Sequence, residues 1–193
     1  MNDAILIKAP SALQQIEARS RNLDFGMASD PRTGALLATL AASKPGGRYL
    51  ELGTGTGVAT AWLLSGMDPT STLISVDSSP EFQAVARQVH GHDPRLTLVQ
   101  ENGIQFLHKQ VPRSFDLVFA DAMPGKYDSL DETLALIKLG GFYVIDDMLP
   151  QSNWPEGHDA KAAALIGSLA TKHEFQAVPL SWSTGIILLV RRA

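Results

Sequence analysis

Short β-rich runs alternate with longer stretches of helical spacing along most of this 193-residue chain, and this alternation limits the folds open to it. Strands that are joined in turn by helices are typical of a parallel sheet with helices on both faces. Two of the runs, LVFA and YVI, are apolar at every position, as expected of central parallel strands. The predicted strands are 48–53, 72–77, 95–100, 115–121, 141–146, 174–180 and 185–192, and the predicted helices are 5–22, 32–42, 58–67, 80–90, 104–110, 129–138 and 159–172.

The last two predicted strands break the alternation. Only residues 181–184 separate them, which is too short for the crossover that parallel strands need, so they are expected to form an antiparallel hairpin. We therefore predict an α/β fold, a Rossmann-like, doubly wound sheet of seven strands, mostly parallel with a C-terminal antiparallel β-hairpin and helices on both faces. Residues 1–193 are expected to form a single domain, in which residues 1–45 supply N-terminal helices that pack on the core.

Composition narrows the classes of partner. Apolar residues make up 45% of the chain, which favours a globular domain with a buried core over disorder. The formal net charge is −4 and no cluster of Lys and Arg occurs, which argues against nucleic acid as a partner. The absence of cysteine excludes disulfides, thiolate metal sites and a cysteine nucleophile. Neither a secretory signal nor a long apolar run is found, so we expect a cytoplasmic protein with no membrane partner.

The segment ELGTGTG at 51–57 follows a predicted strand and opens a predicted helix. Glycines let the backbone turn sharply and approach a ligand closely, and the N-terminus of the helix that follows attracts an anionic group. Asp77 ends the next strand, 20 residues beyond Gly57, where doubly wound folds place an acid that binds ribose hydroxyls. These features predict a site for a nucleoside-type cofactor. A glycine-rich connection that only permits tight packing is the structural alternative.

The glycine spacing also separates two kinds of cofactor. It is Gly-x-Gly-x-Gly after an acid, whereas the dinucleotide fingerprint is Gly-x-Gly-x-x-Gly. The segment resembles motif I of the class I S-adenosylmethionine-dependent methyltransferases. GMASDPRTGALL (26–37), FDLVFADAMPGKYD (115–128) and GGFYVIDDML (140–149) extend the resemblance to the small-molecule O-methyltransferases of the catechol and caffeoyl-CoA type. The resemblance implies S-adenosyl-L-methionine as cofactor, bound by Met27, Glu51, Gly53, Thr54, Gly55, Gly57, Asp77, Glu101, Asn102, Gly103 and Asp121.

The resemblance also implies which part of the cofactor each of these residues would contact. Glu51 and the glycines after it would line the methionine end, and Asp77 would bind the ribose. Residues 101–103 would lie near the adenine, and Met27 would cover the cofactor from the N-terminal side. Two structural alternatives stay open, because Asn102 is also a common turn residue and Met27 a common core residue.

Carboxylates end two consecutive predicted strands. Asp121 ends one, and Asp146 with Asp147 ends the next, so on neighbouring strands they would lie about 4.8 Å apart at one edge of the sheet. Carboxylates that close repel one another unless a cation neutralises them, a proton is retained or one side chain points away. An all-oxygen set suits Mg²⁺ or another hard divalent cation, which is also what the resemblance implies for Asp121, Asp146 and Asp147. The alternatives are a bond from Asp121 to the cofactor ammonium and a turn-capping role for Asp147.

Two residues, Lys126 and His158, are candidates for proton transfer, and the resemblance adds Asp121 to the catalytic set as a cation ligand. Lys126 lies five positions after Asp121, whereas the resembling family has its lysine base three positions after the acid, a place that Pro124 takes here. A solvated surface lysine is the alternative. His158 closes a polar, aromatic loop at the edge of the sheet that carries substrate contacts, and it is suited to accept a hydroxyl proton. A helix cap or an exposed position is its alternative. The predicted catalytic residues are therefore Lys126, His158 and Asp121.

The chain is accordingly expected to transfer a methyl group from S-adenosylmethionine to the hydroxyl oxygen of a small catechol-like or phenol-like molecule, with assistance from a divalent cation. A homodimer is expected from the resemblance. Three other functions stay open: a metal-independent methyltransferase that acts on another nucleophile, a nicotinamide-dependent oxidoreductase, and a cofactor-binding protein without catalysis.

Overall fold

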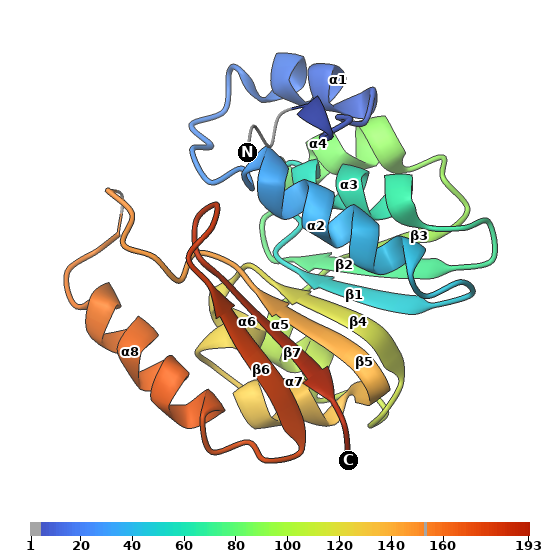
Figure 1. Ribbon diagram of the computed structural model, residues 1–193. Helices are drawn as coiled ribbons and strands as arrows, with labels where there is room; N and C mark the ends of the chain where they lie inside the picture. Colours follow the sequence, from blue (N-terminus) through green and yellow to red (C-terminus); the bar gives the residue numbers. More distant parts are fainter. Residues whose placement is uncertain (1–4, 153) are drawn as a thin grey trace.

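The computed structural model describes residues 5–152 and 154–193. In these residues seven strands form one sheet in the order β3-β2-β1-β4-β5-β7-β6 (Figure 1). All neighbours are parallel except β5–β7 and β6–β7, which are antiparallel. The predicted doubly wound sheet with a C-terminal hairpin is confirmed. The strands are β1 (Arg48–Leu52), β2 (Thr72–Asp77), β3 (Leu96–Gln100), β4 (Phe115–Ala120), β5 (Ile137–Ile145), β6 (Phe175–Leu180) and β7 (Ile186–Arg191).

The helices pack on both faces of this sheet, and each face has its own apolar core. Helices α2 and α3 contribute Leu37 and Leu63 to one core, and α8 contributes Leu165 to the other. The helices are α1 (Ala12–Ser20), α2 (Pro31–Ala42), α3 (Val58–Gly66), α4 (Pro80–His90), α5 (Gly103–Leu107), α6 (Met123–Lys126), α7 (Leu130–Ala135) and α8 (His158–Leu169).

Element boundaries differ from the predicted ones where glycine and proline intervene. Helix α1 begins at Ala12 rather than at residue 5, because Pro10 interrupts the predicted helical stretch. Strand β5 begins at Ile137, where a helix was predicted to continue, and its pairing with β4 shifts register between Phe115 and Leu117. The short helix α6 was not predicted from the sequence, because a proline, Pro124, lies inside it. Pro124 itself has a non-helical backbone in the structure.

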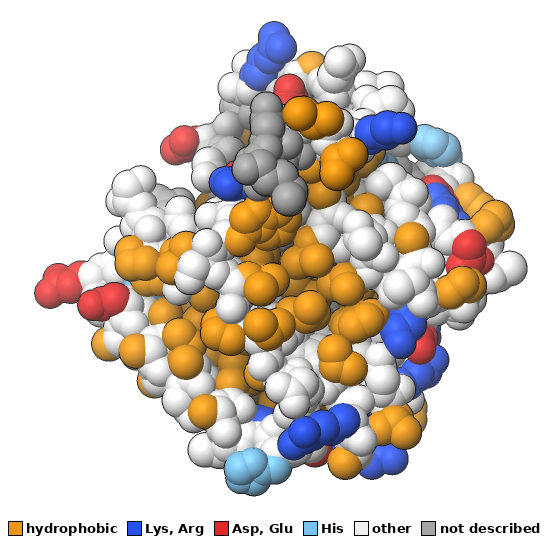
Figure 2. Space-filling model, viewed as in Figure 1, with side chains coloured by type: hydrophobic (Ala, Val, Ile, Leu, Met, Phe, Trp, Pro, Cys, Tyr) orange, Lys and Arg blue, Asp and Glu red, His pale blue; other side chains and the backbone are white. Residues whose placement is uncertain are grey.

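Figure 2 shows one face of the molecule, on which hydrophobic side chains gather over α2 and the β6–β7 hairpin. Leu36 of α2 and Leu188 of β7 are half-buried against the core of this face, and Val178 of β6 is 44% exposed. No helix among the described residues is long and apolar enough to span a membrane. This face therefore presents apolar surface beside the sheet edge where the site described next is found.

Candidate active site

The loop between β1 and α3 carries three glycines with left-handed backbone. Their φ angles are +101° at Gly53, +51° at Gly55 and +93° at Gly57, a region that favours glycine over residues with a side chain. The Gly53 N–H donates to the Val76 carbonyl oxygen at 2.9 Å, which ties the loop to β2. A Cβ on Gly53 would lie 2.8 Å from the Asp121 carbonyl oxygen, so only glycine lets the ends of β1 and β4 approach this closely.

Asp77, at the end of β2, holds this loop in place. Its Oδ2 accepts the Gly55 N–H at 2.7 Å, and its Oδ1 accepts the Ser79 N–H at 2.8 Å. Each carboxylate oxygen has a further lone pair, so the same side chain can still accept hydrogen bonds from a ligand's hydroxyls.

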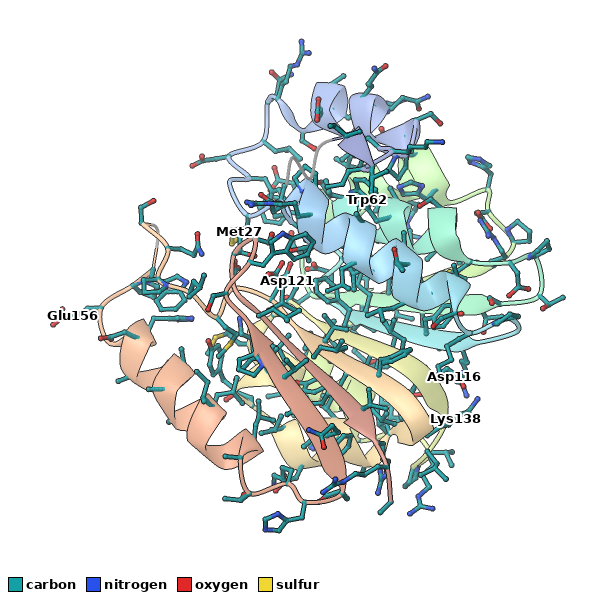
Figure 3. All side chains as sticks on the ribbon, viewed as in Figure 1. Met27, Trp62, Asp116, Asp121, Lys138 and Glu156 are labelled. Carbon is teal, nitrogen blue, oxygen red and sulfur yellow. The ribbon has the colours of Figure 1, made fainter. Side chains whose placement is uncertain are left out.

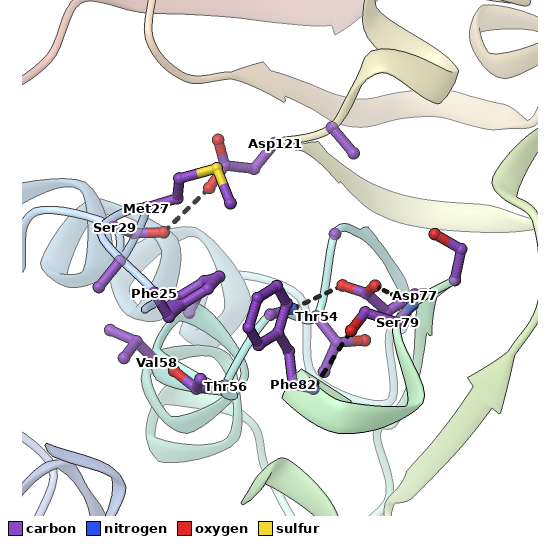
Figure 4. A pocket seen from close by; sticks show the side chains of 16 residues that line it. Phe25, Met27, Ser29, Thr54, Thr56, Val58, Asp77, Ser79, Phe82 and Asp121 are labelled. Atoms are coloured by element: carbon purple, nitrogen blue, oxygen red, sulfur yellow. Dashed lines mark hydrogen bonds between the residues drawn. The ribbon is translucent and has the colours of Figure 1, made fainter. Parts of the chain in front are cut away.

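A cavity of about 290 Å³ lies beside this loop (Figure 4). The start of α4 and the segment before α2 form its other walls, and the rings of Phe25 and Phe82 contact each other there with centroids 4.8 Å apart. Its lining combines apolar side chains with a few polar groups, which is typical of ligand sites. The lining residues are Phe25, Met27, Ala28, Ser29, Gly53, Thr54, Gly55, Thr56, Val58, Ala59, Asp77, Ser78, Ser79, Phe82, Asp121 and Ala122.

Six of the eleven predicted cofactor residues line this cavity, namely Met27, Gly53, Thr54, Gly55, Asp77 and Asp121. Met27 is 63% exposed, so its core alternative is wrong. Figure 3 shows Met27 and Asp121 at one end of the sheet, with Asp116 and Lys138 at the other end. The aromatic pair Phe25–Phe82 was missed, although Phe25 directly precedes the segment 26–37 that supported the resemblance.

Glu51 does not line this cavity, contrary to the prediction. Its side chain is 0% exposed and points into the core below the glycine loop. Its Oε2 accepts a hydrogen bond from the Thr60 hydroxyl at 2.5 Å and another from the Ser75 hydroxyl. Burial raises the pKa of Glu51 to about 7, because a charged carboxylate is poorly solvated there. Glu51 therefore supports the loop from beneath.

Gly57 is also placed differently from the prediction. A Cβ there would lie 2.8 Å from the Ala86 Cβ, so this glycine lets α4 pack against the start of α3. Its N–H donates to the Thr54 carbonyl oxygen at 2.9 Å, inside the loop. The structural alternative for the loop, a glycine that only permits tight packing, is therefore correct for Gly57.

Residues 101–103, predicted near the adenine, lie outside the main cavity. The Glu101 carboxylate pairs with Lys109. The Asn102 side chain accepts the Ile104 N–H at 3.0 Å and caps α5, in agreement with its turn-forming alternative. Gly103 lines a smaller cavity of about 60 Å³, which shares Gly53, Asp77, Ser78 and Ala122 with the main one.

The three predicted metal ligands lie at the carboxyl edge of β4 and β5. Asp121 Oδ2 accepts a hydrogen bond from the Ser29 hydroxyl at 3.1 Å. Burial raises the pKa of Asp121 well above its ordinary value, and the negative charges of Asp146 and Asp147 raise it further. The predicted convergence of carboxylates therefore occurs, with the repulsion that it implies.

Asp146 is held by other parts of the protein rather than left open to an ion. It is 1% exposed. Its Oδ1 accepts the hydroxyl of Thr184 from the β6–β7 turn, the Asp147 N–H at 2.8 Å and the Thr33 hydroxyl of α2 at 3.5 Å. This carboxylate thereby joins β5, the hairpin and α2 at the edge of the sheet.

The donor set does not fit the predicted divalent cation. Among residues 5–152 and 154–193, no three His, Asp or Glu side chains are arranged to hold a metal ion. The physical reason is that Asp146 Oδ1 already accepts hydrogen bonds from three donors, and that the positive charge of Lys126 acts on the same carboxylates. The prediction of a cage formed by Asp121, Asp146 and Asp147 is corrected accordingly.

Lys126 is buried, with 4% of its surface exposed, so its alternative as a solvated surface lysine is wrong. Its Nζ donates to the Asp146 carbonyl oxygen at 2.6 Å and lies 5.1 Å from the centre of the Tyr127 ring. Burial lowers the pKa of Lys126, and the charges of the three aspartates oppose that effect. The loop that carries Pro124 in place of the family's lysine thus still brings a lysine to the carboxylates.

His158 is the first residue of α8 and belongs to an aromatic cluster at the same edge. Its Nε2 lies 3.0 Å from the Tyr127 hydroxyl, and its ring centroid lies 4.5 Å from that of Trp154. Burial lowers the pKa of His158, and the positive charges of Lys126 and Lys161 lower it further. These effects favour the neutral form of the imidazole, which lies next to the Tyr127 phenol. Its alternative as a helix cap is not borne out, because the cap of α8 is Gly157.

Sequence comparison relates this chain to methyltransferases. Residues 50–148 match a family model described as "Methyltransferase domain". A protein of Mycobacterium ulcerans named "Putative O-methyltransferase" is 39% identical over 134 residues, which cover 66% of this chain and 60% of that protein. The chain thus spans about three fifths of the length of the curated relatives that it matches.

Two solved structures share the fold. The O-methyltransferase TomG from Streptomyces achromogenes, in complex with SAM, has a TM-score of 0.83 at 22% identity over 98% of this chain and 93% of that chain. The O-methyltransferase from Bacillus cereus, in complex with SAH, has a TM-score of 0.82 at 18% identity over 98% of this chain and 94% of that chain. At these identities the likeness establishes the architecture.

Proposed function

The chain belongs to the methyltransferase-domain family, and we propose that it transfers the methyl group of S-adenosylmethionine to a hydroxyl oxygen of a small molecule. One observation carries the proposal: a single cavity brings together the glycine loop after β1, Asp77 at the end of β2 and Asp121 at the end of β4. The carboxyl ends of strands are where open α/β sheets bind their ligands. The structures of TomG in complex with SAM and of the Bacillus cereus enzyme in complex with SAH support the choice of cofactor.

The cavity fits such a cofactor in shape and charge. We propose that Asp77, whose oxygens keep free lone pairs beyond the two backbone bonds, accepts the ribose hydroxyls. Asp121, which lines the cavity and is bonded by Ser29, would accept the ammonium of the methionine end. Phe25 and Phe82 would cover the bound molecule and exclude water.

The cofactor, when bound, supplies an electrophilic methyl group on a sulfonium. The remaining contribution of the chain is to hold an acceptor oxygen in line with that methyl group, since positioning provides much of the acceleration in such displacements. We propose His158 as the base for the acceptor hydroxyl, because its imidazole is within hydrogen-bond distance of the Tyr127 hydroxyl and its lowered pKa favours the form that can accept a proton. Lys126 is not proposed as the base, because its Nζ already donates to Asp146.

The proposed mechanism includes no divalent cation. The Asp146 side chain accepts hydrogen bonds from the hydroxyls of Thr33 and Thr184, and the three aspartates at this edge are not arranged to hold an ion. A catechol-like or phenol-like acceptor remains the proposed substrate class. The aromatic cluster of Tyr127, Trp154 and His158 supports it, because aromatic rings offer a stacking surface to a planar acceptor.

Calorimetry followed by an acceptor panel tests this function. S-adenosylhomocysteine should bind at micromolar levels and NAD should not bind, and mass spectrometry should then detect a methylated phenol or catechol but no methylated amine or thiol. Asp116→Ala, at the opposite end of the sheet (Figure 3), is the control that should keep the cofactor affinity. Tight NAD binding would support an oxidoreductase instead. S-adenosylhomocysteine binding without turnover of any acceptor would leave a non-catalytic binding protein.

Two further expectations stay proposals. We propose a homodimer, supported by the apolar surface over α2 and the β6–β7 hairpin (Figure 2). Light scattering should then give twice the chain mass of 20.7 kDa, whereas the single mass would refute it. We also propose the cytoplasm as the location, on the ground of membership of the methyltransferase-domain family, and fractionation of the source cells would test it.

A further inference from the structure

A buried ammonium at the edge of β4 and β5, that of Lys126, interacts electrostatically with three carboxylates. Lys126 is 4% exposed and Asp146 is 1% exposed, so bulk water does little to screen these charges. The positive charge of Lys126 acts on Asp121, Asp146 and Asp147 alike. The chain itself therefore supplies a positive charge that acts on the same carboxylates that a cation would neutralise.

The way in which this lysine is fixed shows that it belongs to the site. Its Nζ donates to the Asp146 carbonyl oxygen at 2.6 Å, and it faces the Tyr127 ring. Gly125, with φ of +84°, makes the turn that aims residue 126 inward, and a Cβ on this glycine would lie 2.2 Å from the Leu52 side chain. The glycine turn and the buried hydrogen bond keep the ammonium at this edge of the sheet instead of in solvent.

The Asp146 carboxylate also binds groups of the protein, where a metal ligand would bind an ion. Asp146 Oδ1 receives the Thr184 hydroxyl, the Thr33 hydroxyl and the Asp147 N–H. Turning that oxygen toward a metal would break the contacts that join the β6–β7 turn and α2 to β5. A divalent ion would in addition lie close to the Lys126 ammonium, and like charges at short range in a buried site repel strongly.

We propose that the Lys126 ammonium replaces the divalent cation at this edge, so that the site binds no Mg²⁺ or Mn²⁺ and the enzyme needs no metal. The part of this inference that concerns turnover rests on the proposed methyl transfer, whereas the part that concerns metal binding does not. An ammonium is a compact point charge with three hydrogen-bond donors, one of which the Asp146 carbonyl oxygen accepts here. A metal, in contrast, offers several coordination positions to an acceptor with two adjacent oxygens.

Titration of the whole protein with Mn²⁺, followed by calorimetry and by thermal unfolding, tests the inference. The wild type should show no saturable binding and no rise in Tm at millimolar Mn²⁺. Lys126→Met removes the positive charge while keeping most of the apolar stem, so its carboxylates should bind Mn²⁺ about tenfold or more tightly than the wild type does. Its Tm should be lowered without metal and partly restored with it. Lys138→Met, which removes the partner of Asp116 at the other end of the sheet, is the matched control and should gain no Mn²⁺ affinity.

Wild-type binding of Mn²⁺ that Asp147→Asn abolishes would overturn the inference, even if the Lys126→Met variant does not fold. A folded Lys126→Met variant with no gain in Mn²⁺ affinity would also overturn it. If methyl transfer is found, EDTA should leave the rate unchanged, and loss of activity in EDTA that Mg²⁺ restores would contradict the inference. If no acceptor is turned over, the proposed function fails while the Mn²⁺ titrations still decide about the ion.

Discussion

Glu51→Gln is the substitution whose effect on stability follows most directly from the structure. Glu51 lies below the glycine loop with 0% exposure, and its Oε2 accepts the hydroxyls of Thr60 and Ser75. In the described part of the chain its Oε1 has no hydrogen-bond partner. A buried carboxylate without full hydrogen bonding is costly when charged, while the neutral acid is tolerated. Glutamine keeps the shape and one acceptor oxygen but carries no charge at any pH.

The magnitude comes from the pKa. Burial raises the pKa of Glu51 from 4.5 to about 7 in the folded protein. The folded state therefore holds this proton more tightly than the unfolded chain does, so the contribution is fully present below about pH 4.5 and is lost as the pH rises through about 7. At 1.36 kcal/mol for each pKa unit, the difference is about 3 kcal/mol of unfolding free energy.

Urea denaturation of both proteins at about pH 5 and about pH 8.5 measures this effect. The stability of Glu51→Gln relative to the wild type should rise by about 2.5 kcal/mol between the two pH values, because the other titrating groups are common to both proteins and cancel. Glu156→Gln, in an exposed loop position (Figure 3), should show no such change. If the relative stability of Glu51→Gln stays constant with pH, Glu51 is already charged or solvated in the folded state and the reasoning is wrong.

Three further substitutions test the site. Gly55→Val should abolish S-adenosylhomocysteine binding, because residue 55 has a φ of +51° and a Cβ there would lie 2.6 Å from the Phe25 ring. Calorimetry on a variant with an unchanged circular dichroism spectrum measures this effect, and retained affinity would show that the cofactor binds elsewhere. Asp77→Ala should weaken binding by about 1.5–3 kcal/mol, the cost of losing hydrogen bonds to a charged acceptor, and an unchanged Kd would remove the ribose role. Thr184→Val should lower the unfolding free energy by about 1–3 kcal/mol, because it removes a donor from the buried Asp146; a neutral effect in urea denaturation would show that this bond is dispensable.

The fold and the place of the cavity could be predicted from the sequence because they depend on local patterns. Alternating β-rich and helical segments imply a parallel sheet, and the short connection at 181–184 implies a hairpin. The carboxyl ends of parallel strands share one edge, so residues at those ends, such as Gly53, Asp77 and Asp121, had to lie near one another. The spacing of residues along the chain is enough to place them at strand ends, whatever the orientation of their side chains.

The direction of individual side chains and their partners were decided by the tertiary structure alone. Strand β1 is buried on both faces, so the alternation of its residues does not indicate whether Glu51 faces the cavity or the core. Asp146 meets Thr33 and Thr184, which are 113 and 38 positions away in the chain, only after α2 and the hairpin have packed on the sheet. Whether a carboxylate is open to an ion or bonded to hydroxyls depends on such distant contacts. The sequence alone determined that the carboxylates of Asp121, Asp146 and Asp147 gather at this edge, because all three follow the ends of neighbouring parallel strands. The packing of distant segments decided that Lys126 is buried beside them, and the energy of a buried charge depends on everything within a few ångströms of it.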